Sequence, residues 1–370
     1  MNKPELSTAL HTKVSAYLLG FISFILFVYV LMALKEILIP FTIAIFLTYL
    51  FHPLVAHLKK YGVPTWVSLV LIFIIVSAIY YLVGLLIVSS LSSFPENMQA
   101  YSTNLSKFLQ QLLTPFNLTV KEFAALFNLN LQEFDFSTVF QGLFKAGIIQ
   151  NIVSSFSAML EDFVIMMIFW VFMVLGKNKF EERVKVAFSG NKESVEKTIV
   201  SFNTQLQSYI VIKTIVSLLV ALVATIIFLA YGIDYALIWG LLTFILNFIP
   251  NIGALIATIA PIVIALLEYG FGFTAVSMAA LLTINHTVVG NLVEPHYLGK
   301  QMDLSPVFVL FSLIFWGWVW GIVGMFLSVP IAAAMKILFS NIEPLKPVAI
   351  LMGSKAESLP VDLSTPSGEG

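Results

Sequence analysis

The sequence contains no cysteine and little charge. Without cysteine the chain can form no disulfide, thiolate nucleophile or cysteine-ligated metal site. Charged residues make up 11% of its 370 residues, against about 25% in ordinary globular domains. That is too few to cover a water-soluble surface of this size, so most of the surface must face lipid. The net charge of -1 carries no basic excess, and nothing in it points to nucleic acid.

Several catalytic signatures are also missing. The sequence has no G-x-x-x-x-G-K-[ST] phosphate loop, no H-E-x-x-H zinc pair and no G-x-S-x-G nucleophile elbow. The triplet Glu294-Pro295-His296 is too tight for helical metal ligands and contains a helix breaker, so we expect no metal and no cofactor. The sequence therefore favours a non-enzymatic protein without catalytic residues.

What the sequence does contain is apolar residues, 59% of the total, gathered in long runs. A helix needs about 20 mainly apolar residues to cross a bilayer. We therefore predict an all-α polytopic membrane protein with about seven to eight hydrophobic segments, two of them helical hairpins or broken helices. The segments are residues 14–34, 37–50, 66–91, 148–175, 210–231, 235–267, 274–293 and 304–335. Segments 37–50 and 235–267 could either cross the membrane or re-enter it.

The pattern of charge and proline predicts five regions along the chain. They are N-terminal membrane helices (1–91), an amphipathic extramembrane insert of short helices broken by Pro95 and Pro115 (92–147), a membrane helix with a cytoplasmic amphipathic helix (148–209), a core transport region with interrupted helices (210–346) and a disordered tail (347–370). Basic residues concentrate at 177–197 and at Lys59 and Lys60, which predicts that these loops and the N-terminus are cytoplasmic.

The first interrupted run contains Asn247, Pro250, Asn251 and Gly253. Unsatisfied backbone groups are costly in lipid, so a helix break survives only inside protein or beside a water-filled cavity. A half-helix end with side-chain amides can bind an ion or a polar solute, which makes these four residues candidate binding residues. The alternative is a proline kink whose asparagines bond to neighbouring helices.

The second interrupted run carries Gly317, Gly321 and Gly324, spaced by four and three, and then Pro330. Small residues on one helical face allow two backbones to approach closely, so these residues are candidates for a hinge or for packing. A plain helix–helix contact is the alternative. Two interrupted apolar runs in one chain are nevertheless a pointer to a transporter's binding site.

Polar residues between the two runs are the third candidate group. On a helix His286, Gly290 and Glu294 would share a face, with Asn291 beside it, and Pro295 would end or kink the helix. Ionisable residues inside a membrane are costly and usually face a cavity or a partner. Glu294 could bind a cation or a proton and His286 could titrate near neutrality. Alternatively, Glu294 is an interfacial residue at a helix end and His286 a packing residue.

Sequence blocks in a fixed order resemble the AI-2E family of bacterial membrane transporters, also described as PerM-like. The blocks are Leu38-Ile39-Pro40-Phe41 with Tyr49-Leu50-Phe51-His52-Pro53-Leu54, Phe248-Ile249-Pro250-Asn251-Ile252-Gly253 with Pro261, Asn291-Leu292-Val293-Glu294-Pro295 with Gly299-Lys300 and Leu304-Ser305-Pro306, and Trp316-Gly317 through Gly321, Gly324-Met325 and Val329-Pro330. They cover most of residues 16–351.

The resemblance implies a multi-pass carrier of the bacterial inner membrane that exports a small polar solute. Members of the family have been associated with autoinducer-2, a furanosyl diol signal, and others with exchange of Na+ or Li+ for protons. A ring-like homo-oligomer, such as a pentamer, is also implied. The motif positions carried over are Pro250, Gly253, Asn291, Glu294, Pro295, Gly317, Gly321 and Pro330.

Three functions remain open at this point. The first is an ion-driven exporter of a small polar solute such as autoinducer-2. The second is a monovalent cation/proton antiporter, for which Glu294, Glu161 and Asp162 are the candidate titrating acids. The third is a non-transporting membrane scaffold whose surface helices serve partners.

Overall fold

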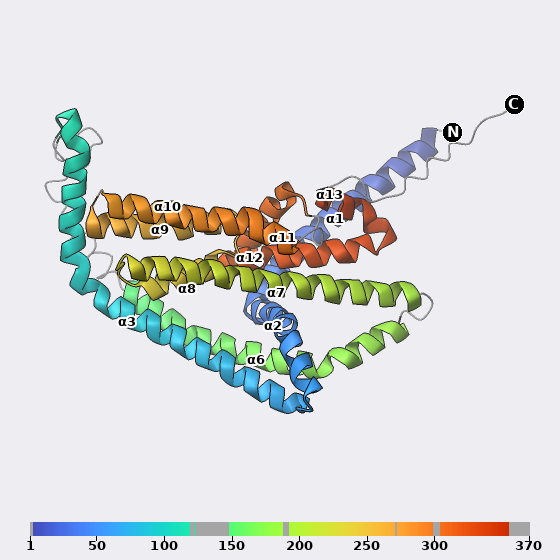
Figure 1. The fold of residues 1–370 in the computed structure, drawn as a ribbon. Coiled ribbons are helices and arrows are strands. Elements are labelled where there is room, and N and C mark those ends of the chain that lie inside the picture. Colours follow the sequence, from blue (N-terminus) through green and yellow to red (C-terminus); the bar gives the residue numbers. More distant parts are fainter. Residues whose placement is uncertain are drawn as a thin grey trace.

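The computed structural model describes residues 3–118, 122, 148–187, 192–270, 272–298 and 304–354. Within these residues the chain is helical almost throughout and has no strand (Figure 1). Five described helices are long and apolar enough to cross a membrane, and three shorter apolar helices accompany them. The predicted all-α polytopic membrane fold is therefore confirmed.

The helices are named in chain order, as labelled in Figure 1. They are α1 (Lys3–Ala33), α2 (Lys35–Lys60), α3 (Thr65–Leu113), the 3-10 turn η1 (Thr114–Phe116), α6 (Ile148–Ala187), α7 (Lys192–Ala230), α8 (Ala236–Leu246), α9 (Ile252–Tyr269), α10 (Phe273–Val288), the π turn η3 (Val289–Val293), α11 (Glu294–Leu298), α12 (Pro306–Ser340), the 3-10 turn η4 (Glu343–Leu345) and α13 (Lys346–Met352).

Helix α2 settles how the short run at 37–50 is built. That run lies within one continuous helix of 26 residues, which contains Pro40 and Pro53. At 1.5 Å per residue the helix is about 39 Å long, enough to cross a bilayer. The run therefore belongs to a long helix that continues beyond residue 50 to Lys60.

Helix α3 continues well past the run that was expected to end at Leu91. It extends to Leu113 and has 49 residues, or about 74 Å, far more than a bilayer requires. The helix passes through Pro95, so the predicted break there is wrong, and η1 falls at Pro115. Figure 1 shows α3 bending along its length. Residues 119–121 and 123–147 of the predicted insert lie outside the described residues.

The described part of the charged stretch between Lys177 and Asn203 consists of the end of α6 and the start of α7, and residues 188–191 lie outside the described residues. The ammonium of Lys185 bonds to the carboxylate of Glu196 at 2.6 Å, which joins the two helices near these ends. From there α7 runs through the molecule and contacts α2, α6, α8, α10, α11 and α12 (Figure 1). It is the helix around which the rest is organised.

Helices α8 and α9 form a hairpin with its turn at residues 247–251. The first arm has only 11 residues, about 16 Å, which is too short to cross a bilayer. At the base, the hydroxyl of Tyr269 donates to the carbonyls of Tyr231 (2.9 Å) and Gly232 (3.0 Å), so the second arm ends beside the start of the first. The run at 235–267 therefore has the geometry of a re-entrant hairpin.

Helix α12 is a second hairpin. Gly321 has φ 65° and ψ -144°, a conformation outside the helical region that divides the helix into two arms, 306–320 and 322–340. The hydroxyl of Ser312 donates to the carbonyl of Ser328 at 2.9 Å, whereas 16 residues of straight helix would separate them by about 24 Å. The break lies at Gly321, because the second arm remains helical through Pro330.

The two hairpins approach from opposite ends of α7. The base of the α8–α9 hairpin lies beside Tyr231, just past the C-terminal end of α7. At the other end, the hydroxyl of Thr198 in α7 donates to the side-chain carbonyl of Asn341, which follows α12. The hairpins meet where Phe248 and Phe326 have ring centroids 4.4 Å apart. The turn of the first hairpin thus meets the second arm of α12 in the interior of the molecule, while Gly321 itself is exposed.

The C-terminal segment is ordered further than expected. Residues Lys346–Met352 form α13, and the carbonyl of Met352 accepts a hydrogen bond from the amide of Ser305 at 2.8 Å. Ala349 and Met352 are buried. The prediction that disorder begins at residue 347 is wrong for this helix, and residues 355–370 lie outside the described residues.

We expect Gly324→Ala to destabilise the protein. A Cβ atom on Gly324 would overlap the backbone carbonyl of Trp316 in the other arm, and overpacking of this kind costs about 1–3 kcal/mol. Gly20→Ala is the matched control, because a Cβ at Gly20 meets nothing within 4 Å. Thermal unfolding in detergent micelles measures both. Equal melting temperatures for the two variants would contradict the hairpin.

Candidate functional site

A line of polar groups runs along the buried face of α7. Lys213 and Ser217 lie one turn apart on this helix and are buried, and the carbonyl of Val220 lies less than one turn further on. Three polar side chains from other elements bond to these groups, namely Asn247, Asn285 and Glu294. We call Lys213, Ser217, Asn247, Asn285 and Glu294 the α7 polar line.

An ion pair between Lys213 and Glu294 forms one end of this line. The ammonium nitrogen of Lys213 lies 2.6 Å from Oε1 of Glu294, and the two side chains are 8% and 23% exposed. Transferring an unpaired charge from water into such a site is strongly unfavourable, so each charge depends on the other. The pair joins two segments 81 residues apart in the sequence.

The π turn η3 explains why Glu294 faces α7. Val289 packs against Val216 and Val220 of α7, so this side of the α10–η3 segment is fixed by apolar contacts. In an α-helix of 3.6 residues per turn, a residue five positions later would point away from that side. A π turn bonds residues five apart and so brings Glu294 back toward α7. Such π turns occur frequently at functional sites.

The middle of the polar line connects α7 to the turn of the α8–α9 hairpin. The side-chain amide of Asn247 donates to Oγ of Ser217 at 2.9 Å. Ser217 is fully buried, so this bond lies deep in the protein. The amide of Asn285 in α10 donates to the carbonyl of Val220 at 3.1 Å, less than one turn further along. A solute that forms hydrogen bonds with hydroxyl and amide groups could replace one partner in these bonds.

The remaining predicted residues of the first break shape its turn. Asn251 has φ 59°, which asparagine tolerates better than most residues, and its side chain is exposed. A Cβ on Gly253 would overlap the carbonyl of Leu246, so glycine is required for the close approach of the two arms. Pro250 is half-buried within the turn. Of the four candidates, Asn247 alone bonds to α7.

Of His286, Gly290 and Glu294, which the sequence predicts on one face, Glu294 bonds to α7. Asn285, Val289 and Glu294 make the contact with α7, while Gly290 and Asn291 are exposed. His286 is half-buried, and its Nε2 is buried without a hydrogen-bond partner among the described residues.

Pro295 does not end the helix, because α11 runs through it. Proline lacks the amide that would bond to the carbonyl four residues earlier, and the helix widens into η3 just before it. In the second run, Gly321 is the hinge, while Gly317 and Gly324 lie close to Met325 and Trp316 of the opposite arm. Pro330 is buried within the second arm.

Lys213 was not among the residues predicted from the sequence. It is the only charged residue in the apolar run at 210–231, and a lone charge of this kind in a membrane segment usually marks a partner or a pathway. That signal would have identified Lys213 as a candidate, although not its partner. Among the described residues, no group of three or more histidine or acidic side chains could hold a metal ion.

Comparison with known proteins adds an independent observation. A sequence model of AI-2E family transporters matches residues 21–343, which include both hairpins and all of α7. The chain belongs to the AI-2E transporter family. It is therefore a multi-pass membrane protein of a transport family, and the resemblance carried by the sequence blocks is confirmed.

Individual members of the AI-2E family align over nearly the whole chain. A Haemophilus influenzae protein provisionally named a transport protein is 32% identical over 328 residues, covering 86% of this chain and 90% of its own length. The AI-2 transport protein TqsA of Escherichia coli K12 is 30% identical and covers 86% and 89%. YhhT of Escherichia coli K12, also provisionally named a transport protein, is 28% identical and covers 87% and 89%.

We expect loss of either member of the Lys213–Glu294 pair to destabilise this AI-2E transporter. Lys213→Met or Glu294→Gln should each cost about 2–3 kcal/mol, below the usual range for a fully buried pair because Glu294 is partly exposed. The double variant should recover much of that loss, since it leaves no uncompensated charge. Unfolding in detergent with a chemical denaturant measures all three.

The exposed pair of Glu343 and Lys346, 2.8 Å apart, is the matched control. Both residues lie on the surface, so Glu343→Gln and Lys346→Met should leave the denaturation midpoint unchanged. Strictly additive losses in the Lys213→Met/Glu294→Gln variant would mean that the two buried charges do not depend on each other.

Proposed function

We propose that this protein is a secondary transporter that exports a small polar solute such as autoinducer-2, driven by an ion gradient. One observation carries the proposal. A helix break is inserted from each end of α7, and the break at 247–251 bonds to the middle of α7 through Asn247 and Ser217. Interrupted helices of this kind form the central binding sites of many secondary transporters.

The α7 polar line offers the chemistry that a small diol needs. The hydroxyl of Ser217 and the amides of Asn247 and Asn285 are donors and acceptors surrounded by apolar packing. A solute hydroxyl could replace the Asn247–Ser217 bond without leaving either group unpaired. Movement of the α8–α9 hairpin against α7 would then expose the site to one side of the membrane at a time. The name of the relative TqsA supports autoinducer-2 as the cargo.

The Lys213–Glu294 pair is the proposed coupling element. It lies one helical turn from Ser217 on the same buried face of α7. Protonation of Glu294, or binding of a cation to it, would release Lys213 and alter the contact between α11 and α7. An ion shifts the equilibrium between the paired and the released arrangement only if it binds one of them more tightly than the other.

A monovalent cation/proton antiporter is the second candidate, favoured by the same pair. The ammonium of Lys213 occupies a position 2.6 Å from a carboxylate oxygen, where a sodium ion would compete with it directly. In that case the cation would itself be the cargo. Among the residues that the structure describes, no specific contact favours a non-transporting scaffold.

We further propose that the protein lies in a bacterial inner membrane with a cytoplasmic N-terminus and assembles as a homo-oligomeric ring. The orientation rests on the basic residues at 177–197 and on Lys59 and Lys60. The exposed aromatic face of α1, with Phe21 63%, Phe24 55% and Phe27 58% exposed, offers a surface for lipid or for another copy.

Release of autoinducer-2 from loaded proteoliposomes tests the function. Wild-type protein should release the solute faster under an imposed proton or sodium gradient than protein-free liposomes do. Glu294→Gln should lower the gradient-driven rate about tenfold or more, because it removes the negative charge of the proposed coupling pair. Asn247→Leu should lower solute release with and without a gradient.

The control variant is Glu343→Gln, which removes an exposed carboxylate outside the polar line. It should leave release unchanged. Gradient-driven release that persists in Glu294→Gln would remove Glu294 from coupling. Sodium-dependent proton flux in the absence of solute would favour the antiporter, and the absence of both fluxes from wild-type protein would contradict both transport functions.

A further inference from the structure

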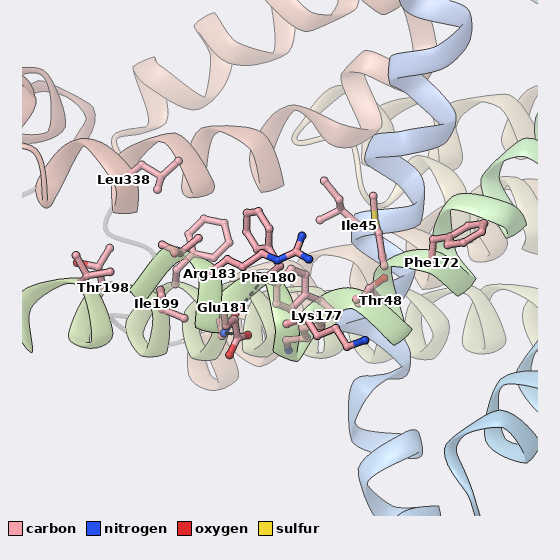
Figure 2. Close-up of a pocket in the computed structure, with 18 of the residues that line it drawn as sticks. Ile45, Thr48, Phe172, Lys177, Phe180, Glu181, Arg183, Thr198, Ile199 and Leu338 are labelled. Carbon is pink, nitrogen blue, oxygen red and sulfur yellow. Dashed lines mark hydrogen bonds between the residues drawn. The ribbon is translucent and has the colours of Figure 1, made fainter. Parts of the chain in front are cut away.

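A large pocket lies apart from the α7 polar line, between α2, α6, the first turns of α7 and the end of α12 (Figure 2). Its volume is about 1210 Å³. Pockets for small molecules and cofactors are typically about 300–1,000 Å³, so the volume of this pocket exceeds that range. Figure 2 shows Ile45 and Phe172 at the α2 side of the pocket and Thr198 and Leu338 at the other side, with charged side chains of α6 between them.

The α2 side of the pocket is apolar. Phe41 and Ile45 of α2 line it together with Phe169, Phe172 and Met173 of α6. Phe41 lies eight residues before Tyr49, which also lines the pocket, so this apolar part extends about 12 Å along α2. Side chains of this kind accommodate hydrocarbon chains.

Cationic side chains line the pocket just beyond the apolar stretch of α6. They are Lys177, Lys179 and Arg183, the last being the only arginine in the sequence. The ammonium of Lys177 lies 5.2 Å from the ring centre of Tyr49, which holds this half-buried side chain at the pocket wall. Burial lowers the pKa of Lys177, against a smaller opposing effect of Glu181, so an adjacent anion would favour its charged form.

Glu181 is the one acidic residue among the described lining residues. Its carboxylate accepts a hydrogen bond from the amide of Asn203 at 3.0 Å, and Asn203 accepts one from the hydroxyl of Tyr49 at 2.6 Å. This hydrogen bond holds the carboxylate at the pocket wall, between α6 and α7. The lining carries three cations against one anion, an excess of positive charge beside an apolar recess.

We propose that this pocket binds an anionic phospholipid, with its phosphate at Lys177 and Arg183 and its acyl chains along Phe41, Ile45 and Phe172. Charge complementarity and the order of the lining residues carry the proposal, because the cations begin where the apolar stretch of α6 ends, as a headgroup does at the edge of the hydrocarbon. Arginine suits this role, since its guanidinium can bond to two phosphate oxygens at once.

A bound lipid would contact α2 and three further structural elements. The pocket is lined by α6, by the start of α7 and by Leu338, Asn341 and Ile342 at the end of the α12 hairpin. The lipid would fill the space between α6 and the base of this hairpin. The site is separate from the α7 polar line, so lipid binding does not depend on which solute or ion the protein transports.

Delipidated full-length protein in detergent tests the proposal. Phosphatidylglycerol and phosphatidylcholine with identical acyl chains are added, and retained lipid is counted by mass spectrometry while thermal unfolding is followed. We expect phosphatidylglycerol to be retained about tenfold more tightly and to raise the melting temperature more. Lys177→Gln/Arg183→Gln should abolish that preference, and Lys177→Arg should keep it.

Lys59→Gln/Lys60→Gln is the matched control, because it removes two exposed cations from the last turn of α2, outside the pocket. The preference should survive in this variant. Equal retention of the two lipids by wild-type protein would overturn the proposal, and so would an unchanged preference in Lys177→Gln/Arg183→Gln. Inorganic phosphate that stabilises the protein as much as phosphatidylglycerol would assign a free-anion site. Delipidated protein that forms oligomers and retains no lipid would assign the surface to a second copy.

Discussion

Every backbone polar group of this protein that lies within the membrane must be bonded inside the protein, because lipid offers no partner. Two broken helices meet this condition by folding back as hairpins against the long helix α7. Gly253 and Gly324 allow the arms of each hairpin to approach closely, and Phe248 and Phe326 cover the place where the hairpins meet. The contact between the hairpins is therefore enclosed by protein, whereas Asn251 and Gly321 at the two turns are exposed.

The same condition explains the α7 polar line. Lys213 and Glu294 would each be strongly unfavourable alone, and Ser217 is bonded to Asn247 in an otherwise apolar environment. These bonds specify how α8, α10 and α11 dock on α7, since a shift of one residue would leave charges unpaired. In the proposed function, an ion or a solute would compete for the same partners. The groups that hold the fold together here are those that transport would have to rearrange.

The sequence alone does not show which prolines and glycines interrupt a helix. The structure shows it from the backbone conformation at each position. Pro95 and Pro330 lie within helices that continue, whereas Gly321 alone turns α12 back on itself. Proline removes one hydrogen bond, which a long helix can tolerate, but φ 65° at Gly321 interrupts the helical path itself. The prediction of a disordered tail is wrong for α13 for a similar reason. Its composition is polar overall, yet Ala349 and Met352 find a packing surface that composition does not reveal.

Amino-acid composition and the length of the apolar runs were sufficient to establish a polytopic membrane protein with two interrupted segments, and the ordered blocks placed it in its family. They also identified Asn247 and Glu294, because amides and carboxylates inside apolar runs are rarely without a role. The tertiary structure alone decided that Glu294 pairs with Lys213 across 81 residues and that the hairpins approach from opposite ends of α7. Both facts depend on how distant helices pack, and the ion pair depends also on the π turn that orients Glu294. Neither is encoded in the local spacing of residues.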